Sequence, residues 1–404
     1  MKKMISIFDI GYKELLLAFY PILSLYNYGG VFNTGLLCLT ILIFCTLIQQ
    51  LFTKKLNVLR FKPLLLFAFF YVFHQFIYFF IIPNVHIQYL TSIIGFVIGI
   101  VAIYLLAPVL NYNKLKNSLY IVAIISFCGL IYHIKQLLSG QGVSPILLPF
   151  LPEPNYDDYR FIDGIRPVSF FIEPQALVSF MLVPFFLSLI SQDYFITTII
   201  FVSLMMSTST TGLLASVLMI LFFMLTQRVS VKTKIMFSLL MTILIIFMIN
   251  SEIFQFGLEK LQNTDSSNIR LSNGPSLVAI TPISELILGI PGENILSYYG
   301  SGVSAKGVEV EQNGDYYFIY VPAFWNVLIT LGICGLFLFL RVFYKISKIN
   351  HITIPFILTI FITFFGVSTT INPLDITVIF SLLIYLDKKN NIDSNLFKTY
   401  LVRI

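Results

Sequence analysis

Long apolar segments alternate with short charged ones along most of this sequence. A bilayer core of roughly 30 Å needs about 20 apolar residues in one helix, and flanking aromatic residues can complete a shorter segment. The pattern therefore predicts about twelve membrane spans. They run approximately over 8–27, 31–51, 63–83, 89–110, 118–138, 174–190, 194–208, 210–226, 235–250, 321–343, 352–370 and 374–387. Lys13 and Glu14 interrupt the first span.

The composition supports this interpretation. Hydrophobic residues make up 57% of the 404 residues and charged residues 11%, and the mean hydropathy is +0.89, far above the value of an ordinary soluble domain. We therefore expect an all-α, polytopic integral membrane protein with a single transmembrane domain over 1–404. The net charge of +6 is scattered over short loops, so nucleic acid is not an expected partner.

The basic residues of the short loops predict the orientation in the membrane. Those of 54–62, 114–116, 228–234 and 341–348 share one side with both termini. We expect this side to be the cytoplasmic face of a bacterial inner membrane. Two large periplasmic loops, 139–173 and 251–320, then lie on the other side. They hold most of the 19 acidic residues but few of the 25 basic ones, so an arginine there needs a reason.

The first large loop contains a densely charged segment between two apolar spans, which must lie in water or in a polar cavity. Arg160 and Arg166 belong to it, and Arg270 lies in the second loop. If the loops fold over one cavity, these three guanidinium groups can bind a diphosphate or carboxylate through their fork-shaped donors. Asp163 and its neighbours can orient them. The alternative is a solvated loop whose arginines only form salt bridges with nearby aspartates.

Two further polar features lie at the ends of expected spans. Glu173 precedes Pro174 at the start of a span, so its carboxylate either caps the helix or points into the cavity as a candidate general base. A hydroxyl-rich turn at 207–212 contains Thr210 and Thr211. Its hydroxyls either cap the next helix or bind a headgroup or sugar.

Aromatic residues gather near the end of the second loop, among them Tyr317 and Tyr320. Such rings either belong to an ordinary interfacial belt or stack on a sugar. Within the same loop, 276–290 predicts a short surface helix that Pro282 interrupts. His133, near an outer helix end, is a candidate contact for an anionic lipid. The four histidines show no metal-ligand spacing, and there is no nucleotide-binding glycine pattern, so neither a metal nor a cofactor is expected.

Five short motifs follow one another between residues 118 and 345. They are RPVSFFIEP at 166–174, STSTTGLL at 207–214, Arg270, LGIPGEN at 288–294 and LGICGL at 331–336. In this order they resemble the O-antigen polymerases of the Wzy type and the related O-antigen ligases.

The resemblance implies a metal-independent glycosyltransferase that extends undecaprenyl-diphosphate-linked oligosaccharides at the periplasmic face. Arg166 and Arg270 would grip the diphosphate of the donor, with Arg160 as a third candidate. Glu173 would orient an arginine or accept the proton of the attacking hydroxyl. Membrane lipid and a chain-length regulator protein would be further partners.

The chain departs from the family pattern at two points. Thr210 or Thr211 stands where many relatives carry an arginine, and the second loop ends in YYFIY at 316–320 without the His–Asn pair of the ligases. The latter favours a polymerase over a ligase that transfers polymer to lipid A core. A lipid-linked oligosaccharide flippase or transporter would carry charges within its spans and symmetrical halves. A structural partner of an assembly complex would tolerate loss of all three arginines.

Overall fold

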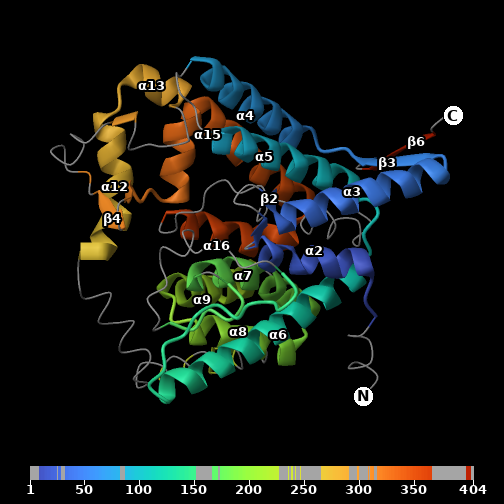
Figure 1. Ribbon diagram of the computed structural model, residues 1–404, viewed down its shortest axis with the longest axis vertical. Helices are drawn as coiled ribbons and strands as arrows, with labels where there is room; N and C mark the ends of the chain where they lie inside the picture. The colour runs from blue at the N-terminus through green and yellow to red at the C-terminus, as the bar shows by residue number, and fades with distance from the viewer. Residues whose placement is uncertain are drawn as a thin grey trace.

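The described part of this computed structural model is mostly helical (Figure 1). It comprises residues 9–24, 26–28, 32–81, 87–151, 166–171, 173–226, 235, 238–239, 242, 246, 265–290, 298–299, 308, 310–313, 316–365 and 397–401. Five of its helices are long and apolar enough to cross a membrane. The protein is therefore embedded in a membrane, as the hydropathy pattern predicts.

The helices follow the expected spans wherever the chain is described. The helices that follow a span are α2 (Tyr12–Leu23), α3 (Thr34–Phe52), α4 (Lys62–Ile81), α5 (Ile87–Leu106), α6 (Tyr112–Leu138), α7 (Pro174–Ser191), α8 (Tyr194–Met206), α9 (Thr210–Thr226), α15 (Ala323–Ile349) and α16 (Ile354–Phe364). Two further helices, α12 (Asp265–Ile280) and α13 (Ile283–Leu288), belong to the second large loop, and a short 3-10 turn covers His351–Thr353. The expected span 374–387 lies outside the described residues, and 235–250 is described only at isolated positions. The number of spans stays a prediction.

Three small antiparallel pairs of strands join the loops. They are β1 (Asn27–Tyr28) with β2 (Phe32–Asn33), β3 (Lys55–Leu59) with β6 (Phe397–Leu401), and β4 (Glu311–Asn313) with β5 (Tyr316–Phe318). The pair β3–β6 brings the last described segment to the loop between α3 and α4.

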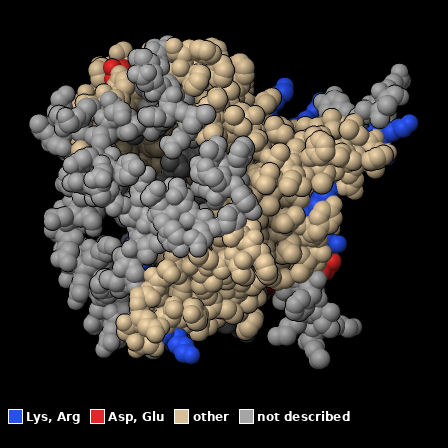
Figure 2. Space-filling view, viewed as in Figure 1, with Lys and Arg blue, Asp and Glu red and all other residues tan. Residues whose placement is uncertain are grey.

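The bundle has two distinct ends in Figure 1. The first, which we call the terminal end, carries β3, β6 and the starts of α4 and α6. The second, the loop end, carries α12, α13 and the carboxyl end of α6. On the face seen in Figure 2, most of the described Lys and Arg side chains lie toward the terminal end. That this end faces the cytoplasm stays a prediction.

Lys13 and Glu14, near the start of the 12-residue helix α2, are buried at the terminal end. The Lys13 ammonium donates to Gln49 Oε1 over 2.6 Å. Glu14 Oε1 accepts the backbone N–H of Asn111, the N-cap of α6, over 2.7 Å. A carboxylate is favourable there because the helix dipole is positive at its amino end. The two charges that interrupt the first span therefore connect α2 to α3 and α6.

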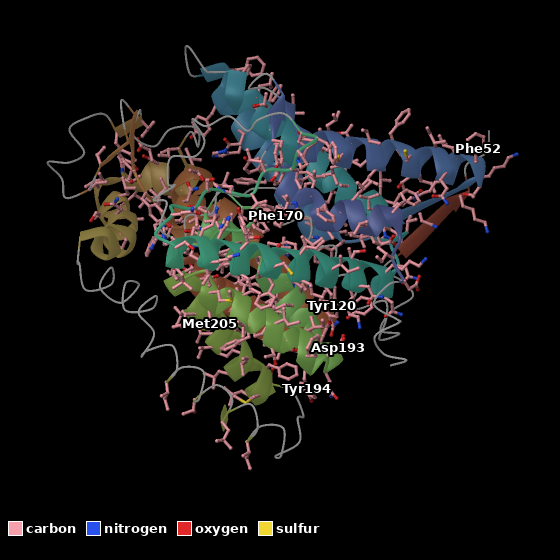
Figure 3. All side chains as sticks on the ribbon, turned by 60° about the horizontal axis from the view of Figure 1, so that its bottom comes forward. Phe52, Tyr120, Phe170, Asp193, Tyr194 and Met205 are labelled. Carbon is pink, nitrogen blue, oxygen red and sulfur yellow. The ribbon has the colours of Figure 1, made fainter. Side chains whose placement is uncertain are left out.

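A second polar contact at the terminal end joins α6 to the corner between α7 and α8. Asp193 Oδ2 lies 3.2 Å from Lys116 Nζ and accepts a hydrogen bond from the Tyr120 hydroxyl at the same distance. Figure 3 shows Tyr120 and Asp193 well apart from Met205, at the other end of α8. This contact fixes where α7 ends and α8 begins.

Helix α7 is the central element of the bundle. Of its 18 residues 72% are buried, against at most 50% of the most apolar 18-residue stretch in each of the other long apolar helices. Phe186 packs on Phe356 of α16 with ring centroids 5.1 Å apart, and Phe185 lies 6.2 Å from Phe201 of α8. Because α7 begins directly after Glu173, the candidate site lies at the mouth of the most enclosed helix.

The second large loop contains ordered elements of its own. Helices α12 and α13 meet at Thr281 and Pro282, where Pro282 was expected to interrupt a helix. Helix α12, the chain around Ile290 and the first part of α15 share a small apolar core, separate from that of the bundle. Its buried members are Leu277, Ile290, Val308, Val321 and Ile329. The loop end is therefore built around a core rather than being an irregular connection.

Gly289 and Gly332 join this loop to α15. Gly332 interrupts α15 with φ 67° and ψ −177°, and Gly289 has φ 84°. A Cβ on Gly289 would lie 2.5 Å from Thr330 O, and one on Gly332 would lie 2.7 Å from the backbone nitrogen of Gly289. Beside them the N–H of Ile290 donates to Ile329 O over 2.9 Å. Two motifs that are far apart in the sequence thus meet backbone to backbone.

We expect Gly289→Ala and Gly332→Ala to destabilise the protein much more than Gly140→Ala. Gly140 also has a positive φ of 71°, but no atom lies within 4 Å of the position that its Cβ would take, so only backbone strain of about 1 kcal/mol is added there. At the other two positions the clash raises the cost to about 3 kcal/mol. Thermal unfolding in detergent, followed by size-exclusion chromatography, measures this order. Equal losses for all three variants would contradict the backbone contact.

Candidate functional site

The loop that carries Arg166 is held by a histidine of α6. The backbone N–H groups of Val168 and Ser169 both donate to His133 Nδ1, over 3.2 and 3.3 Å. Ser169 has φ 56°, a left-handed conformation that non-glycine residues adopt rarely and at a cost. Its carbonyl accepts the N–H of Ile146 over 2.8 Å. Both the backbone N–H and the carbonyl of the strained Ser169 are therefore hydrogen-bonded to other parts of the protein.

Gly129 provides the space for this loop. Ser169 is fully buried, and a Cβ on Gly129 would overlap its hydroxyl and lie 3.0 Å from Ile146 Cδ1. Within the described residues the Ser169 hydroxyl has no hydrogen-bond partner. A larger residue at 129 would push the loop away from α6. Gly129 and His133 lie four residues apart, on one face of the helix, so that face shapes the loop.

His133 was expected to contact an anionic lipid, and this expectation is wrong. Its side chain is fully buried. Since Nδ1 accepts two N–H groups, the ring proton belongs on Nε2, which is buried and has no hydrogen-bond partner among the described residues. Sequence analysis missed this role because a lone histidine carries no sign of the loop it contacts 35 residues later.

Glu173 takes the N-cap position of α7, but its carboxylate does not cap the helix. Its backbone is extended, with φ −143° and ψ 158°, and its side chain makes no capping hydrogen bond. Pro174 follows at the first helical position, where its missing N–H costs nothing. Just before Glu173, Phe171 is buried against Phe180 at 5.5 Å between ring centroids. The half-buried Glu173 therefore joins the Arg166 loop to α7.

Within the hydroxyl-rich turn, Ser209 caps the amino end of α9. The N–H of Gly212 donates to Ser209 Oγ over 3.4 Å, so Thr211 does not serve as the cap. Thr211 is half-buried. A Cβ on Gly212 would lie 2.6 Å from Val178 Cγ2 in the second turn of α7. The turn consequently packs beside the start of α7, near Glu173.

Tyr320 is half-buried at the loop end, next to α12. Its carbonyl accepts a hydrogen bond from Asn273 Nδ2 over 3.3 Å, and Asn273 is fully buried. Arg270 belongs to the same helix, close to the position at which α12 meets the chain before α15. This contact places the Arg270 segment at the loop end.

The structure thus places Glu173 at the start of α7 and the hydroxyl-rich turn beside its second turn, whereas the approach of Arg166 and Thr211 to Glu173 stays a prediction. Arg166 itself is half-buried. The side chains of Arg270, Thr210 and Tyr317, and all of Arg160 and Asp163, lie outside the described residues. The convergence of three guanidinium groups therefore stays a prediction. Among the described side chains no three His, Cys, Asp or Glu groups come close enough to hold a metal ion.

The role of His133 can be tested by hydrogen exchange in detergent. We expect the peptide that contains Val168 and Ser169 to exchange about tenfold faster in His133→Leu, because loss of the acceptor leaves two buried N–H groups unpaired. His133→Asn, whose Oδ1 can replace Nδ1 as the acceptor, should stay close to the wild type. The α13 segment is the internal control. Equal exchange in both variants would show that His133 does not hold this loop.

The comparisons with known proteins add no family to this geometry. Neither the models of known protein families nor the curated proteins match this chain. The function proposed below is therefore argued from the residues and contacts described above.

Proposed function

We propose that this protein is a glycosyltransferase that polymerises undecaprenyl-diphosphate-linked oligosaccharide repeat units at the periplasmic face of the inner membrane. The observation that carries the proposal is the strained, buried backbone at Ser169, which fixes the chain three residues after Arg166 and four residues before Glu173. Strain of this kind costs roughly 1–3 kcal/mol and persists where the surroundings enforce it, commonly at functional sites. A membrane-embedded chain suits a lipid-linked substrate.

The reaction transfers the growing glycan from one lipid diphosphate to the terminal sugar hydroxyl of another lipid-linked repeat unit. The hydroxyl oxygen attacks the anomeric carbon, the bond from that carbon to the diphosphate oxygen breaks, and the diphosphate takes the electron pair. Arg166, with Arg270 as its partner in the hypothesis, would stabilise the charge that grows on the diphosphate. A loop that is already fixed loses little energy to reorganisation during this step.

Glu173 is the candidate acceptor for the proton of the attacking hydroxyl. Its carboxylate is not used as a helix cap, and it lies in the chain segment that joins the Arg166 loop to α7. A carboxylate in this place can also orient a guanidinium group. Both roles require the substrate to lie at the start of α7.

Two features of the described bundle favour this proposal over a transporter. The interiors of α4, α5, α7, α8 and α9 contain no Asp, Glu, Lys or Arg, whereas coupled transport uses charges within the spans. Helix α2 does bury Lys13 and Glu14, but these side chains connect it to α3 and α6 at the terminal end. Helix α15 is broken, as transporter helices often are. The break is filled by the backbone of Gly289 and Ile290 rather than being left for a substrate.

Substitution of the two arginines tests the proposal. We expect Arg166→Ala and Arg270→Ala each to lower chain growth about 10²–10³-fold, as loss of a charge-stabilising donor does, while the protein still inserts. Arg166→Lys should recover little, because lysine lacks the planar fork. The exposed Arg341 of α15 provides the control, and Arg341→Ala should keep normal chains. Long chains from both Arg166→Ala and Arg270→Ala would refute the assignment.

Lipid-linked glycans in a deletion strain separate the polymerase from the ligase. Without a polymerase, the glycans found on undecaprenyl diphosphate are single repeat units, because no unit is extended. Without a ligase, long polymer accumulates on the same lipid. Mass spectrometry of the extracted lipids distinguishes these outcomes, and long lipid-linked polymer would contradict the proposal.

A further inference from the structure

A second polar cluster lies at the loop end, around α13. The Tyr298 hydroxyl is hydrogen-bonded to the half-buried carboxylate of Glu285. The Tyr299 hydroxyl makes a very short hydrogen bond with Thr281 Oγ1. The rings of Tyr298 and Tyr299 meet edge to face, with centroids 5.4 Å apart. One carboxylate and two tyrosines thus gather on one side of a short helix.

Helix α4 holds this cluster in place. His74 Nε2 donates to Leu288 O, and the Tyr78 hydroxyl donates to Gly289 O, both over 2.6 Å. These carbonyls lie at the carboxyl end of α13, where a helix has no partners of its own for them. With the Gly289 contact to α15, they fix Glu285 relative to two membrane helices.

The two sides of α13 differ in character. Ile283 and Ile287 are exposed, at 77% and 45%. Glu285 lies two residues from both isoleucines, on the opposite side of the helix. A short helix with an apolar exposed face beside the outer part of α4 suits the level of the lipid headgroups. Figure 2 shows one small acidic area at the corner of the loop end that α13 occupies in Figure 1.

Both tyrosines stay protonated near neutral pH. Burial, a hydrogen bond to Glu285 and the negative charge of that carboxylate together raise the pKa of Tyr298 to about 12. Burial also raises the pKa of Tyr299, and the Glu285 charge adds to this effect. The cluster therefore presents neutral hydroxyl donors beside one carboxylate acceptor.

We propose that Glu285, Tyr298 and Tyr299 form a saccharide-binding site that holds the glycan of the lipid-linked substrate. A carboxylate can accept hydrogen bonds from two neighbouring hydroxyls of a sugar ring, and it does so more strongly than a neutral acceptor. Tyr298, which is 43% exposed, offers a ring face with a polar tip for an amphipathic ligand. Lipid-linked glycans start at the headgroup level, where α13 lies. The site rests on the proposed function for the source of its ligand.

This site is separate from the Arg166 loop. The loop is fixed by α6 and begins α7, whereas α13 is fixed by α4 and α15. Figure 1 places α13 and α7 on different parts of the molecule. The site would hold sugars away from the reacting bond, so its loss should shorten the polymer without abolishing the first transfer.

Saturation-transfer NMR with the full-length protein in detergent tests the site directly. The probe is the oligosaccharide released by mild acid from the lipid-linked repeat units of the host strain. We expect saturation transfer from the wild type to the oligosaccharide, and binding about tenfold weaker in Glu285→Gln and Tyr298→Ala, as expected for a lost charged acceptor or stacking ring. Tyr298→Phe keeps the ring and should retain more binding than Tyr298→Ala. Tyr194→Ala, a partly exposed tyrosine at the terminal end (Figure 3), is the matched control.

A second probe checks the chemistry of recognition. Periodate oxidation followed by reduction destroys neighbouring hydroxyl pairs of the sugars. The treated oligosaccharide should therefore receive no saturation transfer from the wild type. The proposed site would be overturned if the native oligosaccharide received no saturation transfer from the wild type. It would also be overturned if Glu285→Gln and the wild type gave equal saturation transfer.

The polymer length profile separates this inference from the proposed function. Glu285→Gln should give shorter chains, whereas the arginine variants should give none. If the arginine variants still make long chains while Glu285→Gln loses oligosaccharide binding, the saccharide site stands and the transferase assignment falls. If the arginine variants fail and Glu285→Gln binds and polymerises normally, the transferase assignment stands and the saccharide site falls.

Discussion

Backbone polar groups that leave a helix near a membrane must find partners within the protein, because hydrocarbon offers none. In this bundle, ring-bearing polar side chains provide several of them. His133 accepts two N–H groups from the Arg166 loop, and Tyr26 accepts the N–H of Leu148 over 2.7 Å. His74 and Tyr78 donate to the last carbonyls of α13. The irregular segments of the loop end are consequently held by side chains of helices that are distant from them in the sequence.

The same interactions make the loop end suitable for chemistry on a lipid-linked substrate. A cation on a freely moving loop would spend part of its binding energy on becoming ordered. Ser169 is held in a strained conformation by contacts to α6 and to the segment around Ile146, so Arg166 starts from a fixed backbone. Helix α13 is likewise fixed by two neighbouring helices. Order here comes from hydrogen bonds to the backbone, which do not depend on the identity of the loop side chains.

The sequence predicted the helical membrane fold well, since hydropathy reports directly on burial in lipid. It also singled out the glycine motifs around Gly289 and Gly332, although their mutual contact could not be foreseen. That contact depends on a break inside α15, and nothing in an apolar segment marks a break except a glycine that a regular helix would also tolerate. His133 was misread for a related reason. Its partners are backbone groups, and these have no signature in the sequence.

The break at Gly332 also changes how α15 fits its surroundings. Only 333–349 continues beyond it, a length of about 26 Å at 1.5 Å per residue, which is less than the roughly 30 Å of an average hydrocarbon core. A helix shorter than the bilayer creates a hydrophobic mismatch, which lipids relieve by thinning around it. The outer leaflet beside α15 would then dip toward the protein, bringing phosphate groups down to the height at which the second large loop ends.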